Sequence, residues 1–258
     1  RLPPGVTPLE TGLSLARFRF ADGANGAHVF AQAEAPGALE DHLTAEWVVL
    51  DSTYSPVTRG QQPMGASACR ADQARAASFT ASLAPGRYWV GVHVTDTLGH
   101  RGTAKRMIVV EGGPQQLALS DLVVVCGSPS QSVVAGSSVR LEPETGLFPG
   151  EGDQLHAYFE IYNLTLSATG DSRFVYDCTV RPVLHDRRGW LSRLLAPQSA
   201  PPPIEVSRAE TTIGPMRRQF LSVGVGALPT GSYEISVLVR DAASGAIATA
   251  VASFERRR

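Results

Sequence analysis

The sequence predicts an all-β fold of two tandem immunoglobulin-like β-sandwiches, and an internal repeat is the main observation behind this prediction. The segment Leu83–Tyr88 recurs 145 residues later as Leu228–Tyr233. In each copy a turn with Pro or Gly leads to a Tyr and then to alternating branched residues, which is typical of a strand with one buried face. The chain also has 25 glycines and 18 prolines, yet 43% of its residues are hydrophobic. This composition favours a turn-rich β protein with a core over a disordered chain.

The repeat carries four residues with an expected structural role. Tyr88 and Tyr233 open the two repeated strands, and we expect each to form a tyrosine corner, in which the hydroxyl bonds nearby backbone. Asp96 and Asp241 end the same strands and are expected to begin the next turns.

Two domains and a short linker are predicted. The first domain comprises residues 1–112, the linker 113–118 and the second domain 119–258. The boundary is placed near Glu111–Pro114 because a strand-like segment, Met107–Val110, ends there and a new apolar segment, Leu119–Val125, soon begins.

In the first domain, Leu13–Phe20 is expected to pair with Ala27–Ala33 across a Gly- and Asn-containing turn. Glu46–Asp51 supplies a third strand, and Phe79–Leu83 leads into the repeat. Ala66–Ala77 is rich in Ala, Arg and Gln, so it is either a short helix or a long connection.

In the second domain, Leu155–Leu164 and Arg173–Leu184 are predicted to be long strands that form a central hairpin. Gln219–Val225 and Ala246–Phe254 are predicted strands on either side of the second repeat copy. Between these groups lies a Pro-rich insertion at 186–204, which is too long and too apolar for a simple hairpin loop.

The charge of the chain argues against binding to nucleic acid, and its hydropathy argues against a transmembrane segment. Lys and Arg total 23 against 24 Asp and Glu, a formal net charge of −1, so no overall positive field exists to bind nucleic acid. No stretch of 18 apolar residues occurs, which predicts that the chain has no transmembrane segment of its own. The chain begins at Arg1 without an initiator Met, so we expect that a signal or anchor segment has been removed. A periplasmic or extracellular location, peripheral to a membrane, follows as the expectation.

Three cysteines, Cys69, Cys126 and Cys178, lack the C-x-x-C spacing of zinc or redox sites. Either all three are small buried hydrophobic residues, or Cys126 and Cys178 form a bridge within the second domain, which would leave Cys69 unpaired. Both alternatives remain open at this point.

No catalytic, cofactor-binding or metal-binding residue is predicted. The six histidines lack metal-ligand spacing, and no nucleotide-binding glycine motif or nucleophile elbow occurs. Scattered acids such as Asp51 and Asp96 contain the groups of a glycosidase pair, but we expect them in turns and on solvated strand faces. The loop Glu142–Asp153 has several oxygen donors without calcium-loop spacing. A sugar-binding role would use Trp47, Trp89 or Trp190 as its platform.

Three segments resemble the C-terminal β-sandwich region of bacterial GWxTD-domain proteins: Leu119–Leu122, Glu160–Leu164, and Leu228–Tyr233 with Asp241. The resemblance covers about residues 119–255. The motif that gives the family its name is absent, because Gly189–Trp190 is followed by Leu-Ser-Arg. The resemblance implies an exported bacterial protein without assigned catalysis. The chain also resembles the extra periplasmic subunit of bacterial reaction-centre and light-harvesting photosystems, which implies a photosynthetic membrane complex as partner.

The insertion contains the predicted partner-docking residues. Its apolar side chains fall on one side of a short helical turn with arginines beside them, a combination that often dominates interface energy. These residues are Arg187, Arg188, Trp190, Leu191, Leu194 and Leu195. The alternative is that the segment folds back over its own sandwich edge and shields unpaired strand groups.

The sequence therefore predicts a non-enzymatic exported scaffold or interaction subunit that binds protein subunits of a larger membrane-associated complex and uses no cofactor. The alternative is a carbohydrate-binding or carbohydrate-active accessory module.

Overall fold

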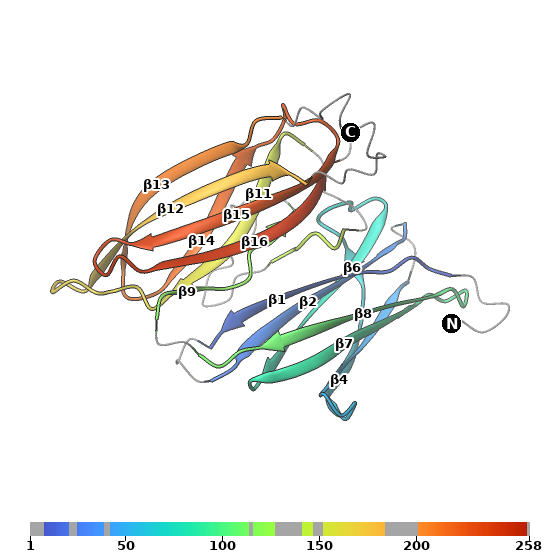
Figure 1. Cartoon of the computed structure of the whole chain (residues 1–258). Helices are drawn as coiled ribbons and strands as arrows, with labels where there is room; N and C mark the ends of the chain where they lie inside the picture. The colour runs from blue at the N-terminus through green and yellow to red at the C-terminus, as the bar shows by residue number, and fades with distance from the viewer. Residues whose placement is uncertain are drawn as a thin grey trace, which may run out of the picture.

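The structure is a computed structural model and consists of antiparallel β-strands joined by turns and loops (Figure 1). It describes residues 8–20, 25–38, 42–113, 116–126, 141–146, 152–183 and 201–256. Its strands form four four-stranded sheets, and the described residues contain no helix. The prediction of an all-β, immunoglobulin-like sandwich fold is confirmed.

The first half of the chain forms two facing sheets. Their strand orders are β1-β2-β6-β5 and β4-β3-β7-β8. The strands are β1 Gly12–Arg19, β2 Ala27–Pro36, β3 Thr44–Leu50, β4 Pro56–Pro63, β5 Gly65–Ala66, β6 Ala74–Leu83, β7 Gly86–Thr95 and β8 Arg101–Val110. The expected pairing of the first two strands is confirmed, because β1 and β2 run antiparallel with Leu13 opposite Ala33.

The second half forms two further sheets, ordered β10-β11-β14, with β9 also paired to β11, and β13-β12-β15-β16. The strands are β9 Ala118–Leu119, β10 Val123–Val125, β11 Gln154–Tyr162, β12 Asp171–Pro182, β13 Ile204–Ile213, β14 Arg217–Gly224, β15 Gly231–Asp241 and β16 Ile247–Arg256.

The two halves share one topology. In the first half, β4-β3-β7-β8 faces β1-β2-β6, and in the second half β13-β12-β15-β16 takes the same chain order opposite β10-β11-β14. The repeated strands are β7 and β15, which occupy equivalent places. The 145-residue repeat is thus the most visible remnant of a sandwich that occurs twice.

Each pair of sheets encloses its own apolar core. In the first core seven of the 20 buried residues in the described part of the chain are alanine, whereas in the second two of 21 are alanine and aromatic rings such as Phe159, Phe174 and Tyr176 fill the space. The second core is therefore built from larger apolar side chains than the first.

The four structural residues of the repeat lie as predicted. The Tyr88 hydroxyl donates to the Ala84 carbonyl over 3.0 Å, and the Tyr233 hydroxyl donates to the Pro229 carbonyl over 2.8 Å. Both side chains are buried, and each bond fixes the turn that precedes its own strand.

The aspartates begin the next turns by accepting backbone hydrogen bonds. Asp96 accepts from the N–H groups of Leu98 and His100, and Asp241 accepts from those of Ala243 and Ser244. The turn prediction for both aspartates is confirmed.

The predicted central hairpin is wrong. Leu155–Leu164 and Arg173–Leu184 contain β11 and β12, but these strands lie in opposite sheets: β11 pairs with β14, and β12 pairs with β13 and β15. Alternating hydrophobicity reports which face of a strand is buried and carries no information about its neighbour. In a sandwich, consecutive strands often cross between sheets.

The alternatives for Ala66–Ala77 are also corrected. The segment is neither a helix nor a plain connection: it holds the end of β5, a turn and the start of β6, where Ala74, Arg75 and Ala77 are buried. Two strands, β4 and β13, were missed because their residues are mostly polar and exposed, as expected of edge strands.

Among the residues that the structure describes, we find no helix with the length and apolar character needed to cross a membrane.

The buried carboxylate of Asp241 predicts a pH-dependent stability. Burial raises its pKa, but hydrogen bonds from the backbone N–H groups of Thr165, Ser244 and Ala243 outweigh burial and hold the pKa below its usual value. Because the folded pKa lies below the unfolded value of about 3.9, the stabilisation is complete above that pH and is lost as pH falls through the folded pKa.

We expect Asp241→Asn to lower the free energy of unfolding by about 1–3 kcal/mol at pH 7, and by less at pH 3. Urea unfolding at both pH values measures this, with the exposed Asp72→Asn as control. An equal loss at both pH values would contradict the role of the charge.

Candidate functional site

The junction between the two sandwiches is the candidate functional site. The outer face of sheet β1-β2-β6-β5 meets the outer face of sheet β10-β11-β14, and an apolar cluster fills the space between them. The buried members of this cluster are Ala16, Val123, Val125, Leu141 and Tyr158, with Phe18, Phe30 and Phe220 packed against them. The Tyr158 ring lies 4.7 Å from that of Phe220 and 5.8 Å from that of Phe18. The two halves thus share a third core.

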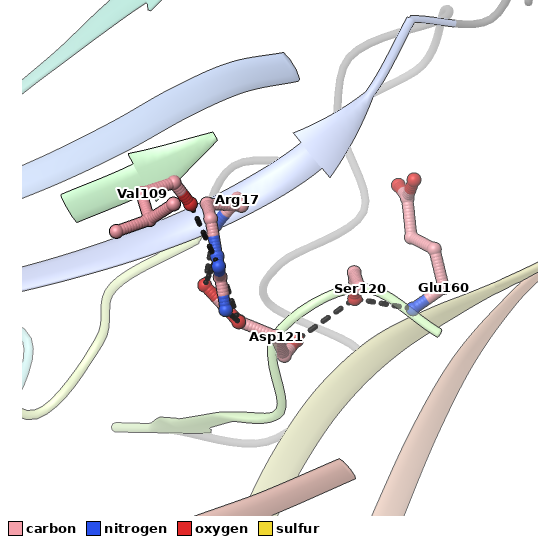
Figure 2. Close-up of polar contacts among 5 residues, drawn as sticks. All are labelled: Arg17, Val109, Ser120, Asp121 and Glu160. Carbon is pink, nitrogen blue, oxygen red and sulfur yellow. Dashed lines mark hydrogen bonds and ion pairs between the residues drawn. The ribbon is translucent and has the colours of Figure 1, made fainter. Parts of the chain in front are cut away.

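An ion pair closes one side of this core. Figure 2 shows the Arg17 guanidinium of β1 beside the Asp121 carboxylate, which comes from the loop before β10. Nη2 to Oδ1 measures 2.6 Å, Nε to Oδ2 measures 2.9 Å, and the Arg17 backbone N–H also donates to Asp121. The remaining Nη1 donates to the Val109 carbonyl at the free edge of β8. One side chain therefore joins β1, β8 and the second half, in the two-pronged geometry that makes Arg–carboxylate pairs strong.

The contacts continue from Asp121 into β11. Ser120 Oγ donates to the Asp121 carbonyl over 2.8 Å and accepts from the Glu160 backbone N–H over 2.9 Å (Figure 2). The Glu160 carboxylate accepts from the hydroxyls of Tyr158 and Tyr162, and the Tyr162 oxygen accepts from the Arg19 backbone N–H. The network therefore returns to β1 at Arg19, two residues after Arg17, and fixes this end of β1 against the second half.

A second set of buried polar groups lies along β2. The Glu34 side chain is fully buried and accepts hydrogen bonds from Ser67 Oγ and from Thr145 Oγ1 of the second half. Its neighbour Gln32, also buried, donates through Nε2 to the Pro143 carbonyl over 2.9 Å. A buried polar group that loses its hydrogen-bond partner lowers the stability of the fold. These bonds therefore also favour one arrangement of the two halves.

A disulfide bond crosses the same junction. Cys69, in the loop between β5 and β6, is bonded to Cys126, directly after β10, with Cα atoms 5.0 Å apart. Both sequence-based alternatives are therefore wrong: Cys126 is not paired with Cys178, Cys69 is not the unpaired residue, and the three cysteines are not all free. Cys178 is buried and free, and burial raises its thiol pKa to about 11.

The pKa shifts of three ionisable groups at the junction keep them in the protonation state that their hydrogen bonds require. Burial raises the pKa of the Tyr158 and Tyr162 hydroxyls, and the Glu160 carboxylate beside them adds to the effect, so both remain protonated donors. The hydrogen bond to Asp121 raises the pKa of Arg17 despite partial burial. All three groups keep the protonation state that their hydrogen bonds require across the physiological pH range.

The predicted docking residues Arg187, Arg188, Trp190, Leu191, Leu194 and Leu195 lie outside the described residues, so their role stays a prediction. Sequence reasoning did not identify the junction. A usable signal was present in β1 and β2, where large aromatic residues such as Phe18 and Phe30 occupy the face opposite the one that points into the core.

Each of the two described tryptophans has a neighbour against its ring. Trp47 stacks on Phe79 of the opposite sheet, with centroids 4.3 Å apart and planes within 4°. A Cβ at Gly60 would lie only 2.7 Å from the other side of the same indole, so Gly60 is needed for that close approach. The Lys105 ammonium lies over the Trp89 ring, 4.1 Å from its centroid. Trp190 is outside the described residues.

Within the described ranges, no group of three or more His, Cys, Asp and Glu side chains lies close enough together to hold a metal ion. The loop Glu142–Asp153, considered above for calcium, lies partly outside those ranges. Asp51 and Asp96, the acids considered for a glycosidase pair, lie at opposite ends of the β3–β7 pair and accept hydrogen bonds within their own turns.

No protein-family model matches the chain, and no curated protein matches it. Among solved structures, it is similar to the C-terminal domain of the Streptococcus agalactiae antigen I/II polypeptide BspA (9% identity, TM-score 0.26, 97% of this chain and 100% of that one). It is also similar to the C-terminal domain of the Streptococcus pyogenes antigen I/II-family protein AspA (8%, 0.24, 96% and 99%). A third similarity is to Bacteroides uniformis beta-glucuronidase 2 (10%, 0.30, 89% and 26%). TM-scores this low carry no argument about function.

The disulfide predicts a defined thiol count and a stability cost. The denatured, unreduced protein should show one thiol, from Cys178, and three after reduction. Replacing both Cys69 and Cys126 with Ala should lower the free energy of unfolding by about 2–4 kcal/mol, because the bridge closes a long loop in the unfolded chain. The matched control is Cys178→Ala, which leaves the bridge intact. Three thiols before reduction would contradict the assignment.

Proposed function

We propose that this chain is an exported, non-catalytic interaction subunit that binds protein subunits of a larger membrane-associated complex as one rigid body. The observation that carries the proposal is the Cys69–Cys126 disulfide across a junction that is also closed by an apolar cluster and an ion pair. A body made rigid in this way loses little conformational entropy on binding, which favours a role in holding other subunits in place.

The disulfide also supports export. Structural disulfides persist in oxidising compartments such as the periplasm and the extracellular space, and they are rare where thiols are kept reduced. A bridge between two halves of a chain has a structural role, and the remaining thiol, Cys178, is buried with a raised pKa that suppresses thiolate chemistry. The disulfide thus supports the proposed periplasmic or extracellular location.

The sugar-binding alternative lacks a comparable observation. Of the described tryptophans named for that role, Trp47 is stacked on Phe79, and the Lys105 ammonium lies over the Trp89 ring. The photosynthetic complex suggested by sequence resemblance is the first named partner to test.

Co-purification from native membranes tests the proposal. We expect the chain to remain with a large membrane complex, in fixed stoichiometry, through detergent extraction and gradient sedimentation. Replacing Trp190 and Leu194 with Ala should reduce retention, with little change in melting temperature, if the insertion docks. Recovery of the chain alone, together with reproducible sugar binding or hydrolysis on a glycan array and hydrolase panel, would contradict the proposal.

A further inference from the structure

The outer face of sheet β4-β3-β7-β8 combines exposed apolar side chains with positive charge. This sheet is the outermost layer of the first sandwich, because the other sheet of that sandwich meets the second half at the junction (Figure 1). Exposed apolar side chains on or beside this face are Tyr54, Val57, Met107 and Val109. Aromatic, Met and Arg side chains are the types enriched at protein–protein contact surfaces.

The charge on this face departs from that of the whole chain. At the outward positions of its four strands the basic residues are Arg59, Arg87, Arg101 and Lys105, and the acidic residue is Glu46. Glu46 lies beside His93, with Oε2 3.8 Å from Nδ1. Within the described part of the chain no carboxylate pairs with Arg59 or Lys105. The face therefore carries three net positive charges in a protein whose net charge is −1.

The equivalent sheet of the second half provides an internal comparison. At the outward positions of β13-β12-β15-β16 the charged residues are Arg173, Arg181 and Arg240 against Asp171, Asp177, Glu205, Glu234 and Glu255. That face has a net charge of −2, and two of its pairs, Arg181–Glu234 and Arg173–Asp171, neutralise each other locally. The shared topology therefore does not explain the positive charge of the first face.

A shallow hollow crosses the centre of the positive face. Arg59, Val48, Gly91 and Lys105 stand side by side on the four adjacent strands, so the two cations lie at the ends of one row and the smallest residue lies between them. The same hollow is lined by Glu46 and His93. A Cβ at Gly91 would meet only Val48, at 3.6 Å, so the space above this glycine is open.

Two aromatic rings hold the Lys105 side chain in place on this face. Its ammonium lies 4.1 Å from the centroid of the Trp89 ring and 5.3 Å from that of Tyr54. Two aromatic rings beside one ammonium restrict the otherwise flexible side chain, which lowers the entropy lost when an anion binds to it. It is also the one lysine of the sequence.

We propose that this face, centred on the row from Arg59 to Lys105, docks an extended acidic segment of a partner protein. Three strand spacings separate the two cations by about 14 Å, and an extended chain places residues four apart at about 13 Å, on the same side. The partner segment would thus present carboxylates at positions i and i+4 and a small apolar side chain between them, above Gly91. This inference rests on the proposed function, because it names the surface and the chemistry of the partner.

Carbodiimide cross-linking of the purified native complex tests the contact directly. The reagent joins an amine to a carboxylate that touches it, and Lys105 supplies the one side-chain amine of the chain. We expect a cross-linked peptide between Lys105 and an Asp or Glu of a different subunit. Lys105→Arg should abolish this product while retention in the complex is preserved, since arginine keeps the charge but does not react.

Charge reversal tests how much Arg59 and Lys105 contribute to binding in the complex. Arg59→Glu with Lys105→Glu should reduce retention in the complex by more than about tenfold, because each removes an attraction and adds a repulsion. Gly91→Val, which fills the hollow at a position with ordinary backbone geometry, should reduce retention without changing the melting temperature of the isolated chain. The matched control is Arg173→Glu with Arg240→Glu on the equivalent face, which should leave retention unchanged.

Three results would overturn the inference. Full retention of the Arg59→Glu/Lys105→Glu chain would place the contact elsewhere and leave the proposed function standing. A Lys105 cross-link to a second copy of this chain would show that the occupant is not a different protein. Absence of any complex from native membranes would remove the proposed function, and this inference with it.

Discussion

The contact between the outer faces of sheets β1-β2-β6-β5 and β10-β11-β14 is the constraint on which the rest of the structure depends. It turns two sandwiches that each have their own core into one body with three apolar layers. The first sandwich needs this contact more than the second, because alanine accounts for seven of its 20 buried core residues and contributes little apolar surface. Partial burial of Phe18 and Phe30 on the far side of the same strands offsets part of that deficit.

The polar groups around this contact fix its geometry. An apolar contact alone is non-directional, and two flat sheet faces tolerate many relative rotations. The two-pronged pairing of Arg17 with Asp121, the bond from Thr145 to buried Glu34 and the Cys69–Cys126 bridge are each satisfied in one arrangement. Breaking the Arg17–Asp121 pair leaves each charge without its partner, and breaking the Thr145 bond removes one of the hydrogen bonds to a fully buried carboxyl group. Orientation between the halves is therefore specified at several separate points, and the positive outer face of the first sandwich is presented at a fixed angle to the second.

The sequence pattern over a few neighbouring residues predicted the strands and turns that form from those residues alone. Alternation identified both repeated strands, and the position of Tyr and Asp relative to Pro and Gly identified two tyrosine corners and two turns. Pairing partners were not accessible in the same way: β11 is dense in aromatic residues and β12 alternates, but neither pattern shows that the two strands lie in opposite sheets. The junction was missed for a related reason, since the sequence does not show what covers the second face of a strand. The disulfide was missed because its two cysteines are brought together only by that junction.

The distance between the two repeat copies tests the central claim, that the junction holds both sandwiches in one arrangement. Thr97 and Ala242 are equivalent exposed positions in the two copies, and spin labels at introduced cysteines there, in a Cys178→Ala chain with the disulfide oxidised, report that distance by pulsed electron paramagnetic resonance. The account predicts a single narrow distance distribution that does not change with salt. A broad or multi-peaked distribution in the oxidised protein would show that the halves move independently and would contradict it.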